Sequence, residues 1–380
     1  MSKFKVATVL GARPQFIKAA MVSKAFGLFP EVEEVIIHTG QHYDANMSDI
    51  FFRELSIPEP DYNLNIGSGL HGRQSGRMLI AIEEVLMKEA PDWVLVYGDT
   101  NSTLAGALAA AKLRIPAAHV EAGLRSFDRD MPEEINRVVA DHTANLLFVP
   151  TTVAFDNLLR EGVPEHSLHL VGDVMYDAAL LYGSAAEKQS RVLERLRLAK
   201  AEYVLATIHR AENTDDRKRL HTILAALGEI ARDLPVVLPL HPRTRCALTD
   251  QEHIRLASTG ICVIDPVGYL DMIMLEKHAR LIATDSGGVQ KEAYFHRVPC
   301  VTYRDATEWT ELVKMGWNRL APPRDIDTVV EGLRDGLESS PSTESFPFGD
   351  GHAAEHIAGI LAGAQGASSS AVRAPVAVRQ

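Results

Sequence analysis

Three acidic motifs lie close together in the first half of the sequence, and carboxylates are side chains that transfer protons. Asp99 follows the apolar run 94–97, Glu121 follows the apolar run 115–118, and Glu133 lies in the segment MPEEINR. Short apolar runs predict buried parallel strands, and open α/β sheets bind ligands at the carboxyl ends of their strands. Like charges gathered at one sheet edge repel each other. The motifs therefore predict acid–base chemistry on a substrate that carries its own counter-groups.

The segment GARPQFIK, residues 11–18, follows the first apolar run and opens a predicted helix. A helix N-terminus flanked by Arg13 and Lys18 can hold an anion. The segment is not a GxGxxG motif, so a dinucleotide fingerprint is absent. A tight strand–helix turn with a surface arginine and lysine is an equally good interpretation of this segment alone.

The segment DSGGVQKE, residues 285–292, is a sharper signal for a bound diphosphate. Ser286 can cap a helix, and Gly287 and Gly288 let the backbone approach a ligand closely. The exposed N–H groups at such a helix start suit a diphosphate, and Glu292 could accept hydrogen bonds from a ribose. The alternative is an ordinary capped helix.

Two histidines accompany these motifs. His209, in TIHRAEN, ends a predicted strand of the second half, where an imidazole can titrate near neutral pH or bind phosphate. His119 precedes Glu121 and is interpreted as a packing residue. Without other signals, a structural role would also be the simpler reading of His209.

The elements that must position these residues alternate between short β-type runs and longer helical segments. The predicted strands are residues 5–10, 34–39, 93–97 and 146–150 in the first half, and 203–207, 235–239, 261–264 and 279–283 in the second. The charged stretch 184–200 separates the halves and is predicted to be helical. This alternation predicts an α/β protein with two Rossmann-like domains that face each other across a cleft.

Composition limits the class of protein. The chain has 380 residues and a formal net charge of −11, which disfavours nucleic-acid binding. Its three cysteines are far apart and form no zinc spacing, so we expect no metal and a reducing compartment. No signal peptide or membrane-spanning stretch is recognisable, which predicts a cytoplasmic protein that does not bind membranes.

Taken in order, the motifs resemble those of the non-hydrolysing UDP-N-acetylglucosamine 2-epimerases. The matching segments are GARPQFIK, GQHYD, GDTNSTLAGALAA, HVEAGLR, MPEEINR, TIHRAEN, DSGGVQKE and FGDGHAAEHI. The resemblance covers nearly the whole chain and implies the glycogen-phosphorylase-like GT-B fold. It implies an N-terminal domain over 1–172, a UDP-binding domain over 173–347, and a helix over 348–363 that returns to the first domain. The Ala-, Ser- and Gly-rich segment 364–380 is predicted to be a flexible tail.

The resemblance also implies an activity and its residues. The family inverts C2 of the sugar by eliminating UDP to a 2-acetamidoglucal and adding UDP back, with no cofactor or metal, and its members commonly form homodimers. Such an enzyme would supply precursors of cell-surface polysaccharides. By motif, the catalytic residues would be Asp99, Glu121, Glu133 and His209. The UDP-binding residues would be Arg13, Lys18, His209, Ser286, Gly287, Gly288 and Glu292.

Several residues depart from the family's usual pattern. Gln15 stands where many members have glutamate, and Asp44 where a second glutamine can occur, which puts allosteric activation by substrate in doubt. The segments GARPQFIKA and TEWTELVKMGWN look more like a subgroup acting on UDP-2,3-diacetamido-2,3-dideoxyglucuronate. Lys291 or Arg304 could meet that sugar's carboxylate, with a solvated surface position as the alternative.

Other functions stay open at this point. A hydrolysing epimerase would share nearly all the motifs and release free sugar. A GT-B glycosyltransferase would use the same nucleotide site together with an acceptor. A non-catalytic nucleotide-sugar sensor is a third alternative, although the three acids with His209 favour retained catalysis.

Overall fold

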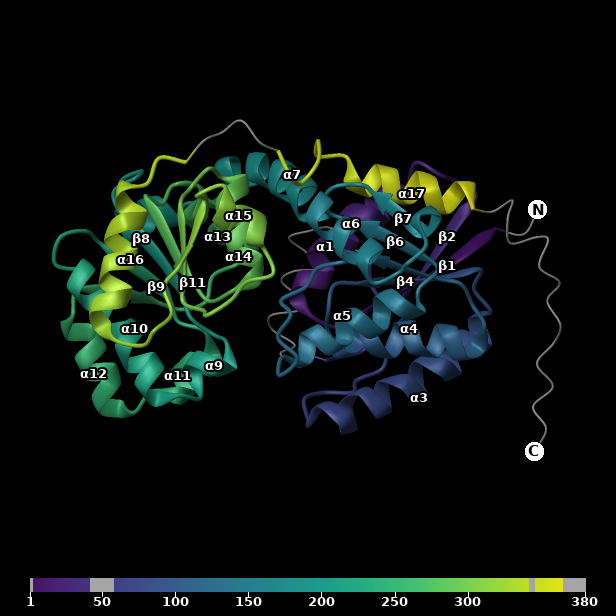
Figure 1. The fold of residues 1–380 in the computed structure, drawn as a ribbon, viewed down its shortest axis with the longest axis horizontal. Coiled ribbons are helices and arrows are strands. Elements are labelled where there is room, and N and C mark those ends of the chain that lie inside the picture. The colour runs from purple at the N-terminus through teal and green to yellow at the C-terminus, as the bar shows by residue number, and fades with distance from the viewer. Residues whose placement is uncertain (1–2, 42–57, 342–345, 365–380) are drawn as a thin grey trace. The chain divides into compact units, whose positions relative to one another are not determined.

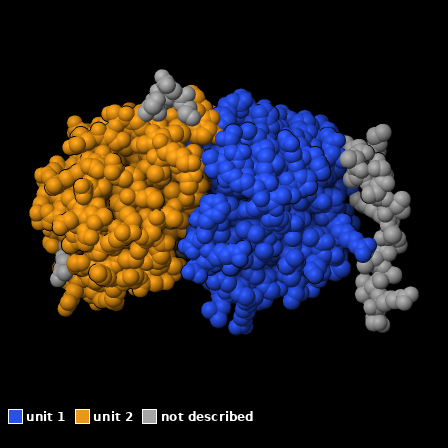
Figure 2. All heavy atoms as spheres, viewed as in Figure 1, with its two compact units in different colours: residues 1–177, 348–380 blue, residues 178–347 orange. Residues whose placement is uncertain are grey.

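The computed structural model describes residues 3–41, 58–341 and 346–364. It divides into two compact units, Met1–Asp177 with Phe348–Gln380 as unit 1, and Ala178–Pro347 as unit 2 (Figure 2). The domain limits at residues 172 and 347 stay predictions, and the two units are used below. The segment HYD of GQHYD, the departure at Asp44, and the tail from residue 365 lie outside the described residues.

Unit 1 contains a parallel sheet with the strand order β3-β2-β1-β4-β5-β6-β7 (Figure 1). Its strands are β1 (Phe4–Leu10), β2 (Val32–His38), β3 (Tyr62–Asn63), β4 (Trp93–Tyr97), β5 (Ala117–Val120), β6 (Leu146–Val149) and β7 (Leu168–Leu170). The order reverses between β1 and β4, and such a switch point is where open α/β sheets bind ligands. The expected acidic motifs after β4 and β5 therefore lie beside the point of reversal.

Helices cover both faces of this sheet. They are α1 (Arg13–Phe26), α3 (His71–Glu89), α4 (Asn101–Leu113), α5 (Pro132–Thr143), α6 (Thr152–Arg160), α17 (Ala353–Gly363) and the short 3₁₀ helix η1 (Glu165–Ser167). Alternate residues of β1, Ala7 and Val9, pack toward α3 and α4 in a buried cluster. Helices α1 and α17 pack together on the other face (Figure 1). Burial on both faces explains why the strands read as continuous apolar runs.

Unit 2 contains a parallel sheet with the order β10-β9-β8-β11-β12-β13. Its strands are β8 (Val204–Thr207), β9 (Val236–Pro239), β10 (Ile261–Ile264), β11 (Leu281–Thr284), β12 (Cys300–Thr302) and β13 (Asn318–Leu320). The reversal lies between β8 and β11, which pair in parallel. His209 follows β8 and the DSGG segment follows β11, so both motifs lie at this switch point.

The helices of unit 2 again lie on both faces of its sheet (Figure 1). They are α8 (Val192–Leu196), α9 (Ala211–Thr214), α10 (Arg217–Ile230), α11 (Pro242–Ala247), α12 (Asp250–Ser258), α13 (Tyr269–Lys277), α14 (Gly287–Phe295), α15 (Thr310–Lys314) and α16 (Ile326–Glu338). Helix α7 (Val174–Gln189) continues from unit 1 into unit 2. The predicted helical stretch 184–200 is helical only in part, as the end of α7 and as α8, and residues 190–191 and 197–200 are not helical. At the interruption, the hydroxyl of Ser190 donates to Asp271.

The expected fold class is confirmed, because the chain is an α/β protein with two parallel, Rossmann-like sheets. Strand positions predicted from apolar runs agree with the structure to within about two residues, the usual uncertainty at element ends. None of the described helices combines the length and the apolar character needed to cross a bilayer. Among the described residues, no three His, Cys, Asp or Glu side chains form a group that could hold a metal ion.

Candidate active site

Gln15 ties together the two strands at the switch point of unit 1. Its Oε1 accepts hydrogen bonds from the N–H groups of Gly11 and Ala12, at 2.8 and 3.0 Å. Its Nε2 donates to the carbonyl of Tyr97 at the end of β4, at 2.8 Å. A glutamate here would have no donor for that carbonyl. Gln15 therefore has a structural role at the switch point.

Gly11 is required by close packing at the end of β1. A Cβ atom on Gly11 would lie 2.0 Å from Oγ1 of Thr39 and 2.4 Å from Oγ of Ser102. The helix that follows, α1, begins at Arg13 and carries Lys18. The predicted anion-binding turn therefore exists as a strand–helix junction at the switch point.

Asp99 is held by two residues of α5. Arg137 donates to the Asp99 carboxylate from NH2 at 2.8 Å and from Nε at 3.1 Å. Asn136 Nδ2 donates to the Asp99 carbonyl at 2.9 Å. The Asp99 side chain stays about one-third exposed, whereas the Arg137 side chain is buried. This places an oriented, accessible carboxylate at the carboxyl end of β4.

Glu121 follows β5 and forms an ion pair with Lys18 of α1. Both side chains are nearly buried. Glu121 has a φ of 71°, a left-handed conformation that is uncommon outside glycine and that often marks functional sites. A Cβ on Gly98 would lie 3.3 Å from both Lys18 Nζ and Glu121 Oε2, so this pair lies against the turn that carries Asp99.

The two glutamates of MPEEINR have different surroundings. Glu134 is buried, accepts hydrogen bonds from the N–H groups of Ser126 and Phe127 at 3.0 Å each, and pairs with Arg137 at 2.6 Å. Glu133 is half-buried in the first turn of α5 and makes none of these contacts. The structure therefore ties Glu134 into the Asp99–Arg137 cluster and leaves the role of Glu133 a prediction.

In unit 2, Asp285 organises the ends of β8 and β11. Its fully buried carboxylate accepts from the N–H groups of His209 and Arg210 and from Nδ2 of Asn213, all at 3.0–3.1 Å. His209 Nδ1 lies 3.6 Å from Asp285 Oδ1, and the His209 side chain remains partly exposed. Asp285 thus fixes the backbone from which His209 projects.

Helix α14 begins as the sequence predicted, with Ser286 as its N-cap. Gln290 steadies this start by donating to the Ser286 carbonyl at 3.1 Å. A Cβ on Gly287 would lie 2.2 Å from Glu308 Oε1, so a larger residue there would displace the Glu308 carboxylate. A Cβ on Gly288 would meet nothing closer than 3.8 Å. The first N–H groups of a helix lack intrahelical partners, so this start can bind an anion.

Lys291 and Arg304 are buried, so their reading as solvated surface residues is wrong. Lys291 Nζ lies 4.7 Å from the centre of the Trp309 ring. Arg304 NH1 donates to Glu308 at 2.9 Å. Both cations therefore belong to the packed interior around α14.

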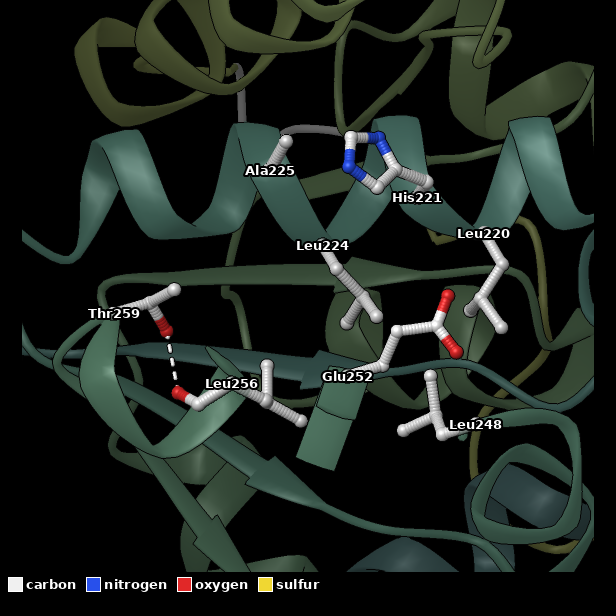
Figure 3. Close-up of a pocket in the computed structure, with 8 residues that line it drawn as sticks. All are labelled: Leu220, His221, Leu224, Ala225, Leu248, Glu252, Leu256 and Thr259. Atoms are coloured by element: carbon white, nitrogen blue, oxygen red, sulfur yellow. Dashed lines mark hydrogen bonds between the residues drawn. The ribbon is translucent and has the colours of Figure 1, made fainter. Parts of the chain in front are cut away.

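An apolar hollow elsewhere in unit 2 lies between α10 and α12 and is shown in Figure 3. Four leucines line most of it: Leu220, Leu224, Leu248 and Leu256. None of the predicted site residues borders this hollow, and its charged members are only Glu252 and, when protonated, His221. It is therefore separate from the acidic and anion-binding motifs.

Comparison with known proteins decides the family. The family model for UDP-N-acetylglucosamine 2-epimerase matches residues 25–362. The chain belongs to the UDP-N-acetylglucosamine 2-epimerase family. It is therefore an enzyme, an isomerase of the epimerase type.

Two curated members of the family illustrate the similarity. The UDP-2,3-diacetamido-2,3-dideoxy-D-glucuronate 2-epimerase of Pseudomonas aeruginosa is 53% identical, over 94% of this chain and 99% of its own. The UDP-N-acetylglucosamine 2-epimerase of Methanocaldococcus jannaschii is 47% identical, over 94% of this chain and 98% of its own. The family resemblance recognised in the motifs is thus confirmed.

Solved structures of the family confirm the fold. The M. jannaschii UDP-GlcNAc 2-epimerase in complex with UDP-GlcNAc and UDP has a TM-score of 0.87 and 47% identity, covering 94% of this chain and 99% of that one. The Neisseria meningitidis enzyme bound to UDP-GlcNAc has a TM-score of 0.85 and 29% identity, covering 94% and 99%. The GT-B-like fold, with two Rossmann-like domains, is therefore that of this epimerase family.

Sequence reasoning missed three residues of the site: Arg137, Asn136 and Asp285. Arg137 and Asn136 lie in the quoted segment MPEEINR, one helical turn after its two glutamates, and that spacing could have suggested a shared face. Asp285 is the first residue of DSGG, and nothing in the sequence distinguishes it as a buried acceptor from the serine and glycines that follow it. Its buried carboxylate is the acceptor that orders the β8 end.

Proposed function

We propose that this enzyme interconverts UDP-N-acetylglucosamine and UDP-N-acetylmannosamine by inverting C2 of the sugar. The observation that carries the proposal is the carboxylate cluster at the switch point of unit 1. There, Arg137 orients Asp99, and Lys18 pairs with Glu121 against the same turn. Family membership and the named substrates of the relatives support the choice of sugar nucleotide.

The proposed reaction breaks the C1–O bond with its electron pair leaving on the β-phosphate of UDP. The C2 proton passes to a carboxylate, and the C2–H electron pair forms the C1=C2 double bond of a 2-acetamidoglucal. Because this proton is weakly acidic, C1–O cleavage runs ahead and gives C1 cationic character, which nearby carboxylates stabilise. UDP then adds back while a proton is delivered to the opposite face of C2.

Three carboxylates are assigned to this chemistry: Asp99, Glu121 and Glu133. A proton is removed from one face of C2 and delivered to the opposite face, which requires more than one proton-transfer group. Asp99 is the most exposed acid among those whose contacts are described above, and Arg137 fixes its direction. We assign Glu133 by its motif position alone, since its neighbour Glu134 is occupied by Arg137 and two backbone N–H groups.

The departing UDP requires groups that hold negative charge. We assign the diphosphate to the start of α14, with Ser286, Gly287 and Gly288, and to His209. Arg13 and Lys18 at α1 complete the proposed cationic set, and Glu292 is assigned to the ribose. Support comes from the close approach of Glu308 to Gly287 and from the buried Asp285 that orders the His209 backbone.

Incubation with UDP-N-acetylglucosamine in D2O tests the proposal. NMR of the recovered sugars should show deuterium at C2 of both epimers, and product formed without deuterium would contradict it. Accumulation of free N-acetylmannosamine would instead identify a hydrolysing epimerase. Turnover without any acceptor excludes a glycosyltransferase, and binding without turnover would identify a sensor. Asp99→Asn should abolish turnover and still bind UDP.

The second candidate substrate is UDP-2,3-diacetamido-2,3-dideoxyglucuronate. It is favoured by the P. aeruginosa relative, whose identity of 53% exceeds the 47% of the M. jannaschii enzyme. The chemistry at C1 and C2 would be the same. Measurement of kcat/KM on both sugar nucleotides with one enzyme preparation decides between them.

We further propose a homodimer in the cytoplasm that needs no cofactor or metal and supplies precursors of cell-surface polysaccharides. The family resemblance supports the dimer, the lack of cofactor and the biosynthetic role. The composition supports the compartment. Light scattering should give twice the chain's mass of 41.7 kDa, and dialysis against EDTA should leave the rate unchanged.

A further inference from the structure

A series of hydrogen-bonded charged side chains contacts the turn that carries Asp99. Its members are His119, Asp141, Arg125 and Glu161. It begins at His119, in the middle of β5, where the backbone is flanked by Val96 of β4 and Leu147 of β6. The His119 side chain is fully buried. Its Nε2 lies 2.7 Å from the carbonyl oxygen of Gly98, and its Nδ1 lies 2.7 Å from Oδ1 of Asp141 on α5.

Both of these partners of His119 are hydrogen-bond acceptors. A backbone carbonyl has no proton to donate, so Nε2 must carry hydrogen toward Gly98. Asp141 also accepts hydrogen bonds on its other oxygen, from the Gly123 N–H at 3.1 Å and from Arg125 NH1 at 2.7 Å. These donors favour its ionised form, so Nδ1 of His119 must carry hydrogen as well. An imidazole that donates from both nitrogens is an imidazolium cation.

A cationic His119 fits the charges of its hydrogen-bonded neighbours. Arg125 also makes a paired contact with Glu161, from Nε at 2.7 Å and NH2 at 2.8 Å. Arg125 with two carboxylates leaves one negative charge, and the imidazolium cancels it. Burial raises the pKa of Asp141, but the hydrogen bonds and charges of His119 and Arg125 outweigh it and bring that pKa below its usual value. Paired burial of this kind is how proteins accommodate interior charges.

We propose that His119 is a buried imidazolium that acts as a positioning residue, holding the Gly98 carbonyl and with it the turn that presents Asp99. Its effect on turnover rests on the proposed function, whereas its protonation state does not. Gly98 has a φ of 62°, so the chain turns sharply directly before Asp99. His119 holds the carbonyl of Gly98 in this turn. Asn136 and Arg137 hold the carbonyl and the carboxylate of Asp99.

The protonation state is measured first, on the wild-type enzyme without substrate. Protein labelled with ¹⁵N in the histidine rings is examined by long-range ¹H–¹⁵N NMR near pH 7, and His119→Gln assigns the signal by its loss. We expect both ring nitrogens of His119 to be protonated. One protonated and one bare nitrogen would overturn the proposal, and this result is independent of which sugar the enzyme uses.

The positioning role is tested with two substitutions that separate the hydrogen bond from the charge. In His119→Gln the side-chain amide cannot donate to both acceptors, because one of its two polar atoms is an oxygen. We expect kcat to fall by about 10²-fold, as for other small misplacements of a reacting group, with an unchanged Kd for UDP. An unchanged kcat would overturn the role.

Asp141→Asn is the matched variant. The asparagine oxygen can still accept from Arg125 and Gly123, and its amide can donate to a neutral His119 that keeps its Nε2 hydrogen bond to Gly98. We expect His119 to show one protonated nitrogen and kcat to stay within about threefold of wild type, since the positioning bond remains. A loss as large as that of His119→Gln would overturn positioning through the Gly98 carbonyl.

His142, which contacts Glu161 at the exposed end of this series of side chains, provides a control. His142 Nε2 lies 3.0 Å from Glu161 Oε2 and is far more exposed than His119. We expect His142→Gln to leave kcat and the NMR signals of His119 unchanged. If His119→Gln fails to fold, the His119 signal is assigned by its change in Asp141→Asn, whose residue 141 contacts Nδ1, and the two spectra then decide the proposal.

Discussion

Arg137 donates to the carboxylate of Asp99 at 2.8 Å from NH2 and at 3.1 Å from Nε, so one guanidinium fixes the direction of this acid. The remaining nitrogen, NH1, is held by the buried Glu134 at 2.6 Å. Arg137 is thus clamped between an interior carboxylate and an accessible one. This arrangement presents Asp99 at the strand edge with a cation hydrogen-bonded to its carboxylate.

Replacing Arg137 by lysine should keep the charge but lose the planar fork that contacts both acids. We expect kcat to fall by about 10²-fold with little change in the Kd for UDP, because only the direction of Asp99 changes. Steady-state kinetics and UDP calorimetry measure the two effects. Arg160→Lys, at an exposed position, is the matched control and should behave as wild type. Equal loss of UDP affinity and kcat would contradict this account.

Replacing Lys18 by methionine should leave the nearly buried Glu121 without its cation. Breaking a buried ion pair on one side typically costs about 3–5 kcal/mol, so the free energy of unfolding should fall by about that amount. Denaturant titration measures this. The double variant Lys18→Met with Glu121→Gln should recover most of the stability but none of the activity. A single variant as stable as wild type would show that the pair is solvated.

Replacing Asp285 by asparagine should disorder the end of β8. The Asp285 carboxylate accepts from two backbone N–H groups and the Asn213 amide, and an asparagine would turn a donor toward some of them. We expect UDP to bind at least about tenfold more weakly, since each lost buried hydrogen bond to a charge is worth about 1.5–3 kcal/mol. Asp265→Asn, at an exposed ion pair, is the control. Unchanged UDP affinity measured by calorimetry would remove Asp285 from this role.

Asp177 should make the stability of unit 1 depend on pH. Burial raises its pKa from 3.8 to about 6, although the Ala354 and Ala353 N–H groups at the start of α17 partly oppose this. The carboxylate is therefore the unfavourable form, and stability is lost as pH rises through about 4 to about 6. The difference between the two values corresponds to about 3 kcal/mol above pH 6.

Asp177→Asn removes this cost and keeps an oxygen that can accept from Ala354. We expect its free energy of unfolding to exceed that of wild type at pH 8 by up to about 3 kcal/mol, and to match it at pH 4. Denaturant titrations at both pH values measure the difference. A variant that is less stable than wild type at pH 8 would contradict the direction of the shift.

Nine of the thirteen described strands were predictable because strands buried on both faces produce apolar runs that the sequence displays directly. The other four, β3, β7, β12 and β13, have only two or three residues each and give no such run. Asp99 and Ser286 were predictable for the same reason, since each follows such a run and lies at a strand end. The contacts among side chains were not, because they join residues far apart in the chain. His119, interpreted as packing, bonds Asp141 across 22 positions, and Gln15 reaches the Tyr97 carbonyl across 82.

The sequence also could not show which of two neighbouring acids makes a given contact. Glu133 and Glu134 have the same chemistry, and only the rotation of α5 decides which of them turns toward Arg137. The burial of Lys291 and Arg304 could not be read from their charge, because paired cations can occupy an interior.

The most direct test of the central claim follows the oxygen that joins C1 of the sugar to the β-phosphate. UDP-N-acetylglucosamine labelled with ¹⁸O at this bridging position is incubated with the enzyme, and the substrate is recovered and analysed by ³¹P NMR. The account predicts that the label scrambles into the non-bridging β-phosphate positions, because free UDP rotates before it adds back. Epimerisation with the label retained entirely in the bridge would contradict cleavage of the C1–O bond.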